Sequence, residues 1–283
     1  MSADARWVED LPALAAEAYA LAGRFCGACR DYHALWPYRR ITLMHCETTT
    51  DQGAVGAALA ELMARGGQRV LIAGAADSGV LATVARAAGG QAGEIRVVDR
   101  CETPLELCRR FARRWSLPLE TARADLLRLE ITNPVDIVYA NSIIPAFPPA
   151  RRLDLFARIA RALQPGGHFV QTFNVSRRVA QEQFPDYGEQ YRRWVFDELA
   201  RRGIPIPDDR EIFGRRLLSF AAGWPRRLGA FERPGDVKPL LEAAGFAVQR
   251  LEPIAVRIEA PYQRYLTTLG KQRFLAVAER LLG

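Results

Sequence analysis

Acidic residues stand at the ends of two neighbouring strands that the sequence predicts. Asp99 ends the apolar run Ile95–Val98, and Asp125 follows a predicted strand at 118–123. A carboxylate at such a strand end can accept hydrogen bonds from both ribose hydroxyls of an adenosine. The second carboxylate can accept from the exocyclic amine of adenine, while the apolar Leu126 covers the ring. We therefore expect an adenosine site here, and the alternative for either aspartate is a local strand-end cap.

A turn of small residues precedes these aspartates. Val70–Ala73 is a short apolar run, and Gly74, Ala75 and Ala76 follow it before a predicted helix at 79–88. Small residues let a ligand approach the backbone, and free N–H groups at a helix N-terminus can receive an anionic group. The spacing also matches a relaxed dinucleotide fingerprint. On this motif alone, a nicotinamide-dependent oxidoreductase and a turn without a ligand stay open.

Cysteine and histidine residues gather in the N-terminal segment. Cys26, Cys29 and His33, with His45 or Cys46, could supply four tetrahedral ligands to Zn²⁺. Only one Cys-x-x-Cys pair is present, so we favour buried thiols in a helical cap and predict no metal. The chain has five cysteines, an odd number, and we expect no secretory signal, which together argue against a disulfide framework.

The same segment holds the candidates for acceptor chemistry. Histidine titrates near neutral pH, and a tyrosine hydroxyl can hydrogen-bond an acceptor. The candidate catalytic residues are His33, His45, Tyr32 and Tyr38. The candidate substrate-binding residues are Trp36, Tyr187 and Tyr191. Tyr187 and Tyr191 stand four residues apart, a spacing that is also typical of the buried face of a helix.

The elements that must position these residues alternate between strands and helices. We expect strands at 70–73, 95–98, 118–123, 135–139, 168–173 and 246–252. We expect helices at 8–25, 52–65, 79–88, 103–115, 150–163, 235–244 and 261–281. This rhythm predicts an α/β fold, in which a doubly wound, mostly parallel sheet carries helices on both faces.

The alternation of strands and helices does not extend over the whole sequence, which suggests a division into four parts. We expect an N-terminal helical cap or substrate segment over 1–66, a core over 67–175 and 233–257, an insertion or lid over 176–232, and a C-terminal helix over 258–283. The insertion is expected to be partly helical and to lie over the carboxyl edge of the sheet.

Two later blocks carry a family resemblance. The block VDIVYANS begins at Val135 and is followed by a helix and an L-x-P-G-G turn from Leu163, and GDVKPLLEAAGF begins at Gly235. Over 68–175 and 233–255 the order of elements resembles that of the class I, Rossmann-like S-adenosylmethionine (SAM)-dependent methyltransferases. The resemblance implies SAM as the cofactor and a methyl transfer to an acceptor.

The resemblance also implies a role for each matching position. The turn residues would lie under the methionine part of SAM, and the first aspartate would hold the ribose. The second aspartate and the leucine after it would contact the adenine. Residues after the fourth strand would line the reaction centre. The expected cofactor-binding residues are Gly74, Ala75, Ala76, Asp99, Arg100, Asp125, Leu126, Asn141 and Ser142. Ile72, Ala76 and Ser78 depart from the usual family pattern, so an inactive binding or scaffold protein is an alternative.

Composition narrows the class of partner. The net charge is +7, but the arginines are spread along the chain, and Asn141–Ile144 lacks the Asn/Asp-Pro-Pro-aromatic motif of nucleic-acid amino-methyltransferases. No apolar run is long enough for a membrane span. Acidic residues in the first segment argue against a secretory signal. We therefore expect a cytoplasmic methyltransferase for a small-molecule acceptor, with no nucleic acid or membrane partner. A homodimer is left open, and the alternative activity is an NAD(P)-dependent oxidoreductase.

Overall fold

A single twisted sheet organises the molecule. The computed structural model describes residues 7–43, 52–89, 93–176, 186–223, 230–255 and 272–282. Seven strands hydrogen-bond in the order β3-β2-β1-β4-β5-β7-β6. They are β1 (Arg69–Ala73), β2 (Glu94–Asp99), β3 (Leu119–Arg123), β4 (Val135–Asn141), β5 (Leu163–Val175), β6 (Phe246–Ile254) and β7 (Gln272–Arg280). Strands β1 to β5 pair in parallel, whereas β7 runs antiparallel to both β5 and β6. The predicted α/β class is confirmed.

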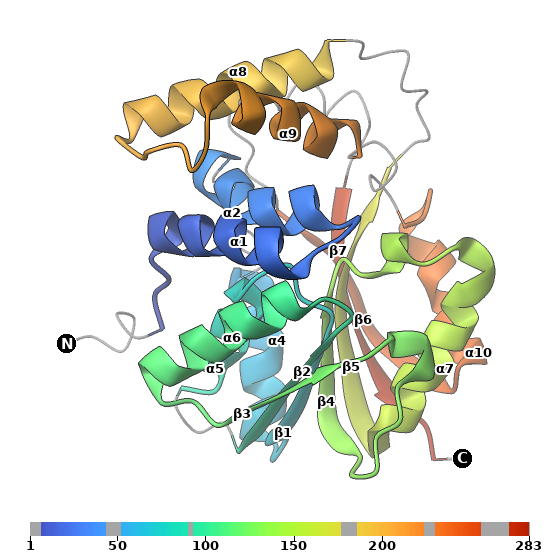
Figure 1. Cartoon of the computed structure of the whole chain (residues 1–283). Coiled ribbons are helices and arrows are strands. Elements are labelled where there is room, and N and C mark those ends of the chain that lie inside the picture. Colours follow the sequence, from blue (N-terminus) through green and yellow to red (C-terminus); the bar gives the residue numbers. More distant parts are fainter. Residues whose placement is uncertain are drawn as a thin grey trace.

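Helices cover both faces of the sheet because successive side chains of a strand point to opposite sides. Ile72 of β1 packs into a core with α4 (Gln52–Ala64), α5 (Gly79–Ala87) and α6 (Glu102–Trp115). Leu71, its neighbour, packs into the opposite core. That core is completed by α7 (Arg152–Ala162) and α10 (Lys238–Ala243). Figure 1 shows these two helix layers on either side of the strands.

A helical cap lies over the end of the sheet at which the parallel strands finish (Figure 1). It is formed by α1 (Leu11–Phe25), α2 (Arg30–Leu43), α8 (Tyr187–Arg201) and α9 (Arg210–Ala222). These helices share one apolar core, which includes Leu35, Tyr38, Tyr191 and Phe213. The N-terminal segment and the insertion, which are far apart in sequence, therefore pack together above the carboxyl ends of the strands.

The predicted C-terminal helix over 261–281 is wrong for Gln272–Arg280, which form strand β7. Residues 261–271 lie outside the described ranges. The apolar run Phe274–Ala278 is buried between β5 and β6, where it pairs with both neighbours. A short apolar run fits a buried strand as well as a buried helix, so its periodicity could not distinguish the two.

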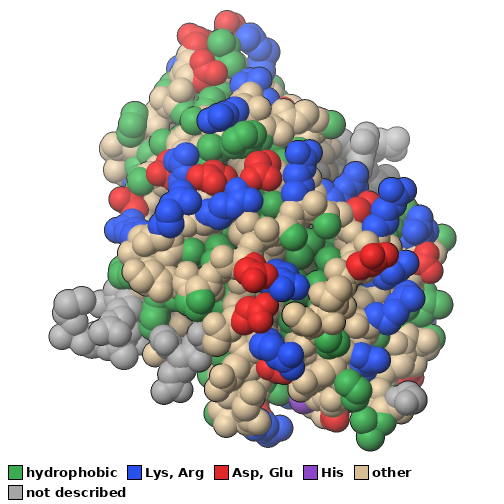
Figure 2. Space-filling model, turned by 60° about the horizontal axis from the view of Figure 1, so that its bottom comes forward, with side chains coloured by type: hydrophobic (Ala, Val, Ile, Leu, Met, Phe, Trp, Pro, Cys, Tyr) green, Lys and Arg blue, Asp and Glu red, His purple; other side chains and the backbone are tan. Residues whose placement is uncertain are grey.

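Positive charge on the surface is balanced locally by acidic side chains. Figure 2 shows arginine and lysine side chains interspersed with acidic ones over the face that it presents. Ion pairs such as Arg69–Asp136 at 2.8 Å and Arg96–Glu120 at 2.7 Å account for part of this mixing. In the part of the chain that the structure describes, every helix is too short or too polar to cross a membrane.

Candidate active site

A cavity of about 480 Å³ opens where the sheet reverses its winding direction. The chain passes from β1 outward to β2 and β3, and then returns to β4 on the other side of β1. The loops after neighbouring strands diverge at such a point and leave a crevice for a ligand. The cavity is lined by Tyr32, His33, Trp36, Gly74, Ala75, Ala76, Val80, Asp99, Arg100, Leu126, Asn141, Ser142, Ile143, Pro145, Ala146, Phe147 and Asn174.

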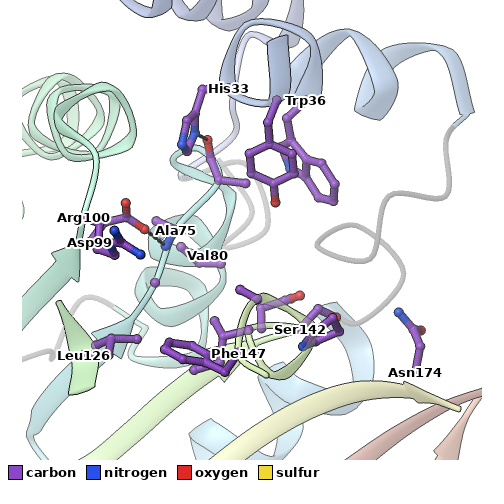
Figure 3. Close-up of a pocket in the computed structure, with 17 residues that line it drawn as sticks. His33, Trp36, Ala75, Val80, Asp99, Arg100, Leu126, Ser142, Phe147 and Asn174 are labelled. Atoms are coloured by element: carbon purple, nitrogen blue, oxygen red, sulfur yellow. Dashed lines mark hydrogen bonds between the residues drawn. The ribbon is translucent and has the colours of Figure 1, made fainter. Parts of the chain in front are cut away.

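Asp99 at the end of β2 is oriented by the backbone on both sides. One carboxylate oxygen accepts a hydrogen bond from the Ala75 N–H at 2.9 Å, and the other accepts from the Cys101 N–H at 2.7 Å. Figure 3 shows the contact with Ala75 and the position of Asp99 beside Arg100. An ionised carboxylate has about four acceptor positions, so the two amides leave acceptor capacity at the cavity.

Gly74 makes the turn after β1 possible. Its φ is +82°, a conformation that side chains other than glycine's rarely adopt. A Cβ atom at this position would also lie 2.8 Å from the Cγ2 atom of Ile143. The Gly74 N–H bonds the Val98 carbonyl at 2.8 Å, so the turn stays close to β2. Both the backbone conformation and the close approach of Ile143 therefore require glycine.

A buried charge cluster fixes the far side of this turn to the cap. The Arg40 Nη1 atom of α2 donates to Asp77 Oδ2 at 2.8 Å, and the Arg40 guanidinium also pairs with Glu9. The Ser78 hydroxyl donates to Glu9 at 2.7 Å, and Asp77 accepts from the Gly79 N–H at 2.8 Å. Burial alone would raise the pKa of Glu9, but Arg40 holds that pKa below its usual value. Sequence reasoning missed this cluster, although Ser78 in place of the usual glycine was its one visible sign.

Polar side chains form the other end of the cavity. Asn141 is the last residue of β4, Ser142 follows it, Asn174 lies on β5, and all three line the cavity. Ser142 has a φ of +52°, an unusual value for a residue with a side chain. Behind them the buried Arg273 of β7 donates to Ser142 Oγ at 2.7 Å, to Asn174 Oδ1 at 3.2 Å and to Asn141 Oδ1 at 3.2 Å. Arg273 was not among the expected site residues because its segment was expected to be helical.

The structure brings together most of the expected cofactor-binding residues. Gly74, Ala75, Ala76, Asp99, Arg100, Leu126, Asn141 and Ser142 all line the cavity. Asp125 does not line it. The Asp125 side chain instead accepts a hydrogen bond from the Leu127 N–H at 3.0 Å and caps a short helical turn at residues 126–128. Its contact with adenine stays a prediction.

The expected acceptor residues separate into two groups. Tyr32, His33 and Trp36 lie on α2 and line the cavity, and Figure 3 shows His33 and Trp36 above Ala75, on the turn after β1. Tyr38 and Tyr191 are instead fully buried in the core of the cap, and Tyr187 packs against that core. His45 lies outside the described residues. The cavity therefore presents two aromatic rings and one imidazole from the cap.

His33 interacts mainly with thiols. Its side chain and those of Cys26, Cys29 and Cys101 place their ligand-type atoms within 4.8 Å of one another. Burial would lower the pKa of His33, but hydrogen bonds with Cys101 and Cys29 raise that pKa to about 10. In turn, burial would raise the pKa of Cys101, but His33 lowers it to about 6. Cys101 was not connected with this cluster by sequence reasoning, because it lies on a different element.

Comparison with known proteins agrees with this arrangement. Residues 70–167 match the family model described as a methyltransferase domain. The chain is 43% identical over 126 residues to carboxy-S-adenosyl-L-methionine synthase from Ectopseudomonas mendocina. That match covers 41% of this chain and 50% of the relative, so it spans about half of the curated protein's length.

Solved structures share the fold at low sequence identity. A possible exported protein from Bordetella parapertussis superposes with a TM-score of 0.55 at 17% identity, over 100% of this chain and 98% of that one. Magnesium protoporphyrin IX methyltransferase from Synechocystis PCC 6803, crystallised with S-adenosylhomocysteine (SAH), gives a TM-score of 0.50 at 14% identity, over 82% of this chain and 83% of that one. Residues 70–167 are therefore similar to a methyltransferase domain, and the chain shares the Rossmann-like α/β fold of these solved structures.

Proposed function

We propose that this protein is a SAM-dependent methyltransferase that acts on a small-molecule acceptor. The observation that carries the proposal is the position of Asp99. Its two oxygens are held by the Ala75 and Cys101 amides at the rim of the cavity, next to the point where the sheet reverses. A carboxylate oriented in this way is suited to accept hydrogen bonds from the two ribose hydroxyls of an adenosine.

The rest of the cavity fits the other parts of SAM. Leu126 and Phe147 offer apolar surface beside Asp99, where an adenine ring would lie (Figure 3). The small residues Gly74 and Ala76 leave room for the methionine part along the turn. Asn141 ends β4 and lies at the polar end of the cavity, where the reaction centre would be. These residues would hold SAM, which supplies an electrophilic methyl group when it is bound.

Methyl transfer requires mainly that the acceptor atom be held in line with the methyl group. Reacting atoms about 3–3.5 Å apart and correctly aligned can account for a large part of the rate enhancement. Tyr32 and Trp36 of α2 reach the cavity from the cap and would position the acceptor. The same rings would exclude water, and Asn141 and Asn174 could hydrogen-bond an acceptor hydroxyl or amine. A separate base is needed only if the acceptor atom must lose a proton.

Isothermal titration with SAM, SAH and NAD⁺ tests the proposal on the full-length protein. We expect saturable heats with SAM and SAH, and none with NAD⁺. Binding of NAD⁺ without SAM would support the oxidoreductase instead. Absence of binding by all three in a folded sample would support a scaffold protein.

A second candidate activity involves carboxy-S-adenosyl-L-methionine, the compound after which the relative from Ectopseudomonas mendocina is named. The buried Arg273 guanidinium stands behind Ser142, Asn141 and Asn174 at the reaction-centre end. A cation at that end favours a transferred group that carries a carboxylate over an uncharged methyl group. Mass spectrometry of the ligand that co-purifies with the protein distinguishes SAM from its carboxylated form.

A further inference from the structure

Three thiols and one imidazole converge where the cap meets the core. Cys26 and Cys29 lie between α1 and α2, His33 lies in the first turn of α2, and Cys101 stands two residues after the end of β2. Their ligand-type atoms all lie within 4.8 Å of one another. The Cys101 Sγ atom is 3.2 Å from the Cys26 Sγ atom and 3.7 Å from the Cys29 Sγ atom.

These separations, from 3.2 Å upward and all within 4.8 Å, are close to those of the ligands around one small ion. Zn–S bonds of about 2.3 Å in a tetrahedron place neighbouring ligand atoms roughly 3.8 Å apart. Three cysteines and one histidine are a ligand set of closed structural zinc sites. An iron–sulfur cluster holds several iron atoms between its cysteines and would need the thiols farther apart. A disulfide would use only two of the four converging side chains.

The hydrogen bonds around the cluster orient its ligands. The His33 Nδ1 atom lies 3.3 Å from the Ala76 carbonyl oxygen. A carbonyl only accepts, so Nδ1 keeps its proton, and a metal would take the place of the proton on Nε2. Zinc-bound histidines commonly donate their other N–H to a carbonyl in this way. The Thr103 hydroxyl, 3.1 Å from the Cys26 Sγ atom, can donate to a thiolate.

The local electrostatics favour thiolate ligands. Cys101 is the N-cap residue of α6, a helix of 14 residues. The N-terminus of such a helix carries partial positive charge, which stabilises a neighbouring thiolate. His33 and Cys101 are buried and Cys26 and Cys29 are half-buried, so the ligands are largely shielded from water.

We propose that Cys26, Cys29, His33 and Cys101 bind one Zn²⁺ ion that fastens the cap to the core. The ion would connect the α1–α2 segment to Cys101, whose N–H bonds Asp99, and to Ala76 through the imidazole. It would therefore hold together the two sides of the cavity rim. This site rests on the four side chains alone and does not depend on the proposed methyl transfer.

Metal analysis of the full-length protein and two cysteine variants tests the assignment. We expect about one zinc per chain in the wild type. Cys101→Ser should lose most of that zinc. Cys108→Ser is the matched control, because Cys108 is also a buried cysteine of α6 but lies outside the cluster. The control should keep its zinc.

Cobalt substitution keeps the test decisive if Cys101→Ser does not fold. Wild-type protein stripped by a chelator and titrated with Co²⁺ should develop thiolate-to-cobalt charge-transfer bands and the visible bands of a tetrahedral site. Melting temperature should fall on chelation in the wild type and in Cys108→Ser. Absence of stoichiometric zinc together with absence of these bands would overturn the assignment, as would another metal in stoichiometric amount or a Cys26–Cys101 disulfide in the purified protein.

Discussion

Replacing Asp99 with asparagine is the sharpest test of the cofactor site. The carboxylate accepts from the Ala75 N–H at 2.9 Å and from the Cys101 N–H at 2.7 Å. Asparagine keeps the shape but turns one oxygen into an NH₂ group, which then faces a backbone donor. The side chain also becomes neutral. The variant therefore weakens the acceptor for ribose and leaves one backbone amide without its partner.

The size of the effect follows from these contacts. A hydrogen bond to a charged group contributes about 1.5–3 kcal/mol. The asparagine side chain would accept from at most one ribose hydroxyl, without the charge, so we expect a loss of about 2–3 kcal/mol in binding. That loss corresponds to a Kd for SAM or SAH raised roughly 30- to 150-fold. The unpaired backbone amide should separately cost about 1–3 kcal/mol of folding stability.

The assay is calorimetric titration with SAH, together with a urea denaturation of each protein. Asp136→Asn is the matched control, because Asp136 also accepts two backbone N–H bonds, from Gln68 and Arg69, but lies at the opposite end of the sheet. We expect the control to lose stability and keep its affinity. A folded Asp99→Asn protein with a Kd within about threefold of the wild type would refute the assigned role of Asp99.

Three further predictions concern the turn after β1, the ion pair of Asp136 and the buried charge cluster of Arg40. Gly74→Ala should weaken SAM binding and lower the free energy of unfolding by about 1–3 kcal/mol. Gly66→Ala is the control, because Gly66 has a φ of +104° but open space at the Cβ position. The control should leave binding unchanged in the same titration. Burial would raise the pKa of Asp136, but hydrogen bonds from Arg69 lower it. The ionised Asp136 therefore stabilises the folded protein fully above the unfolded pKa of about 4, and this contribution is lost as the pH falls further. The stability gap between wild type and Asp136→Asn should therefore be constant from neutral pH to about pH 5 and should close below about pH 4; a gap that widens in acid would contradict this sign. Arg40→Met leaves two buried carboxylates without their cation and should cost about 3–5 kcal/mol in urea denaturation; a cost under about 1 kcal/mol would show that the cluster does not fasten the turn to the cap.

Local sequence patterns determined most of the sheet and the identity of its loops. Alternating apolar runs and amphipathic spacings predicted β1 to β6 and the helices between them, because these elements depend mainly on neighbouring residues. The residues that follow parallel strands must gather at one edge of the sheet. Gly74 and Asp99 were therefore predicted to share one site, and the family resemblance added Asn141; all three line the same cavity.

Tertiary structure alone decided the features that depend on distant partners. Phe274–Ala278 became part of β7 because β5 and β6 offer it two pairing edges, and this placed Arg273 behind Ser142 at the polar end of the cavity. Tyr191 entered the cap core because α8 packs on α2, a contact between segments far apart in the chain. Cys101 joined Cys26, Cys29 and His33 for the same reason. Periodicity within one segment records which side chains share a face, but the partner of that face is chosen only when the whole chain packs.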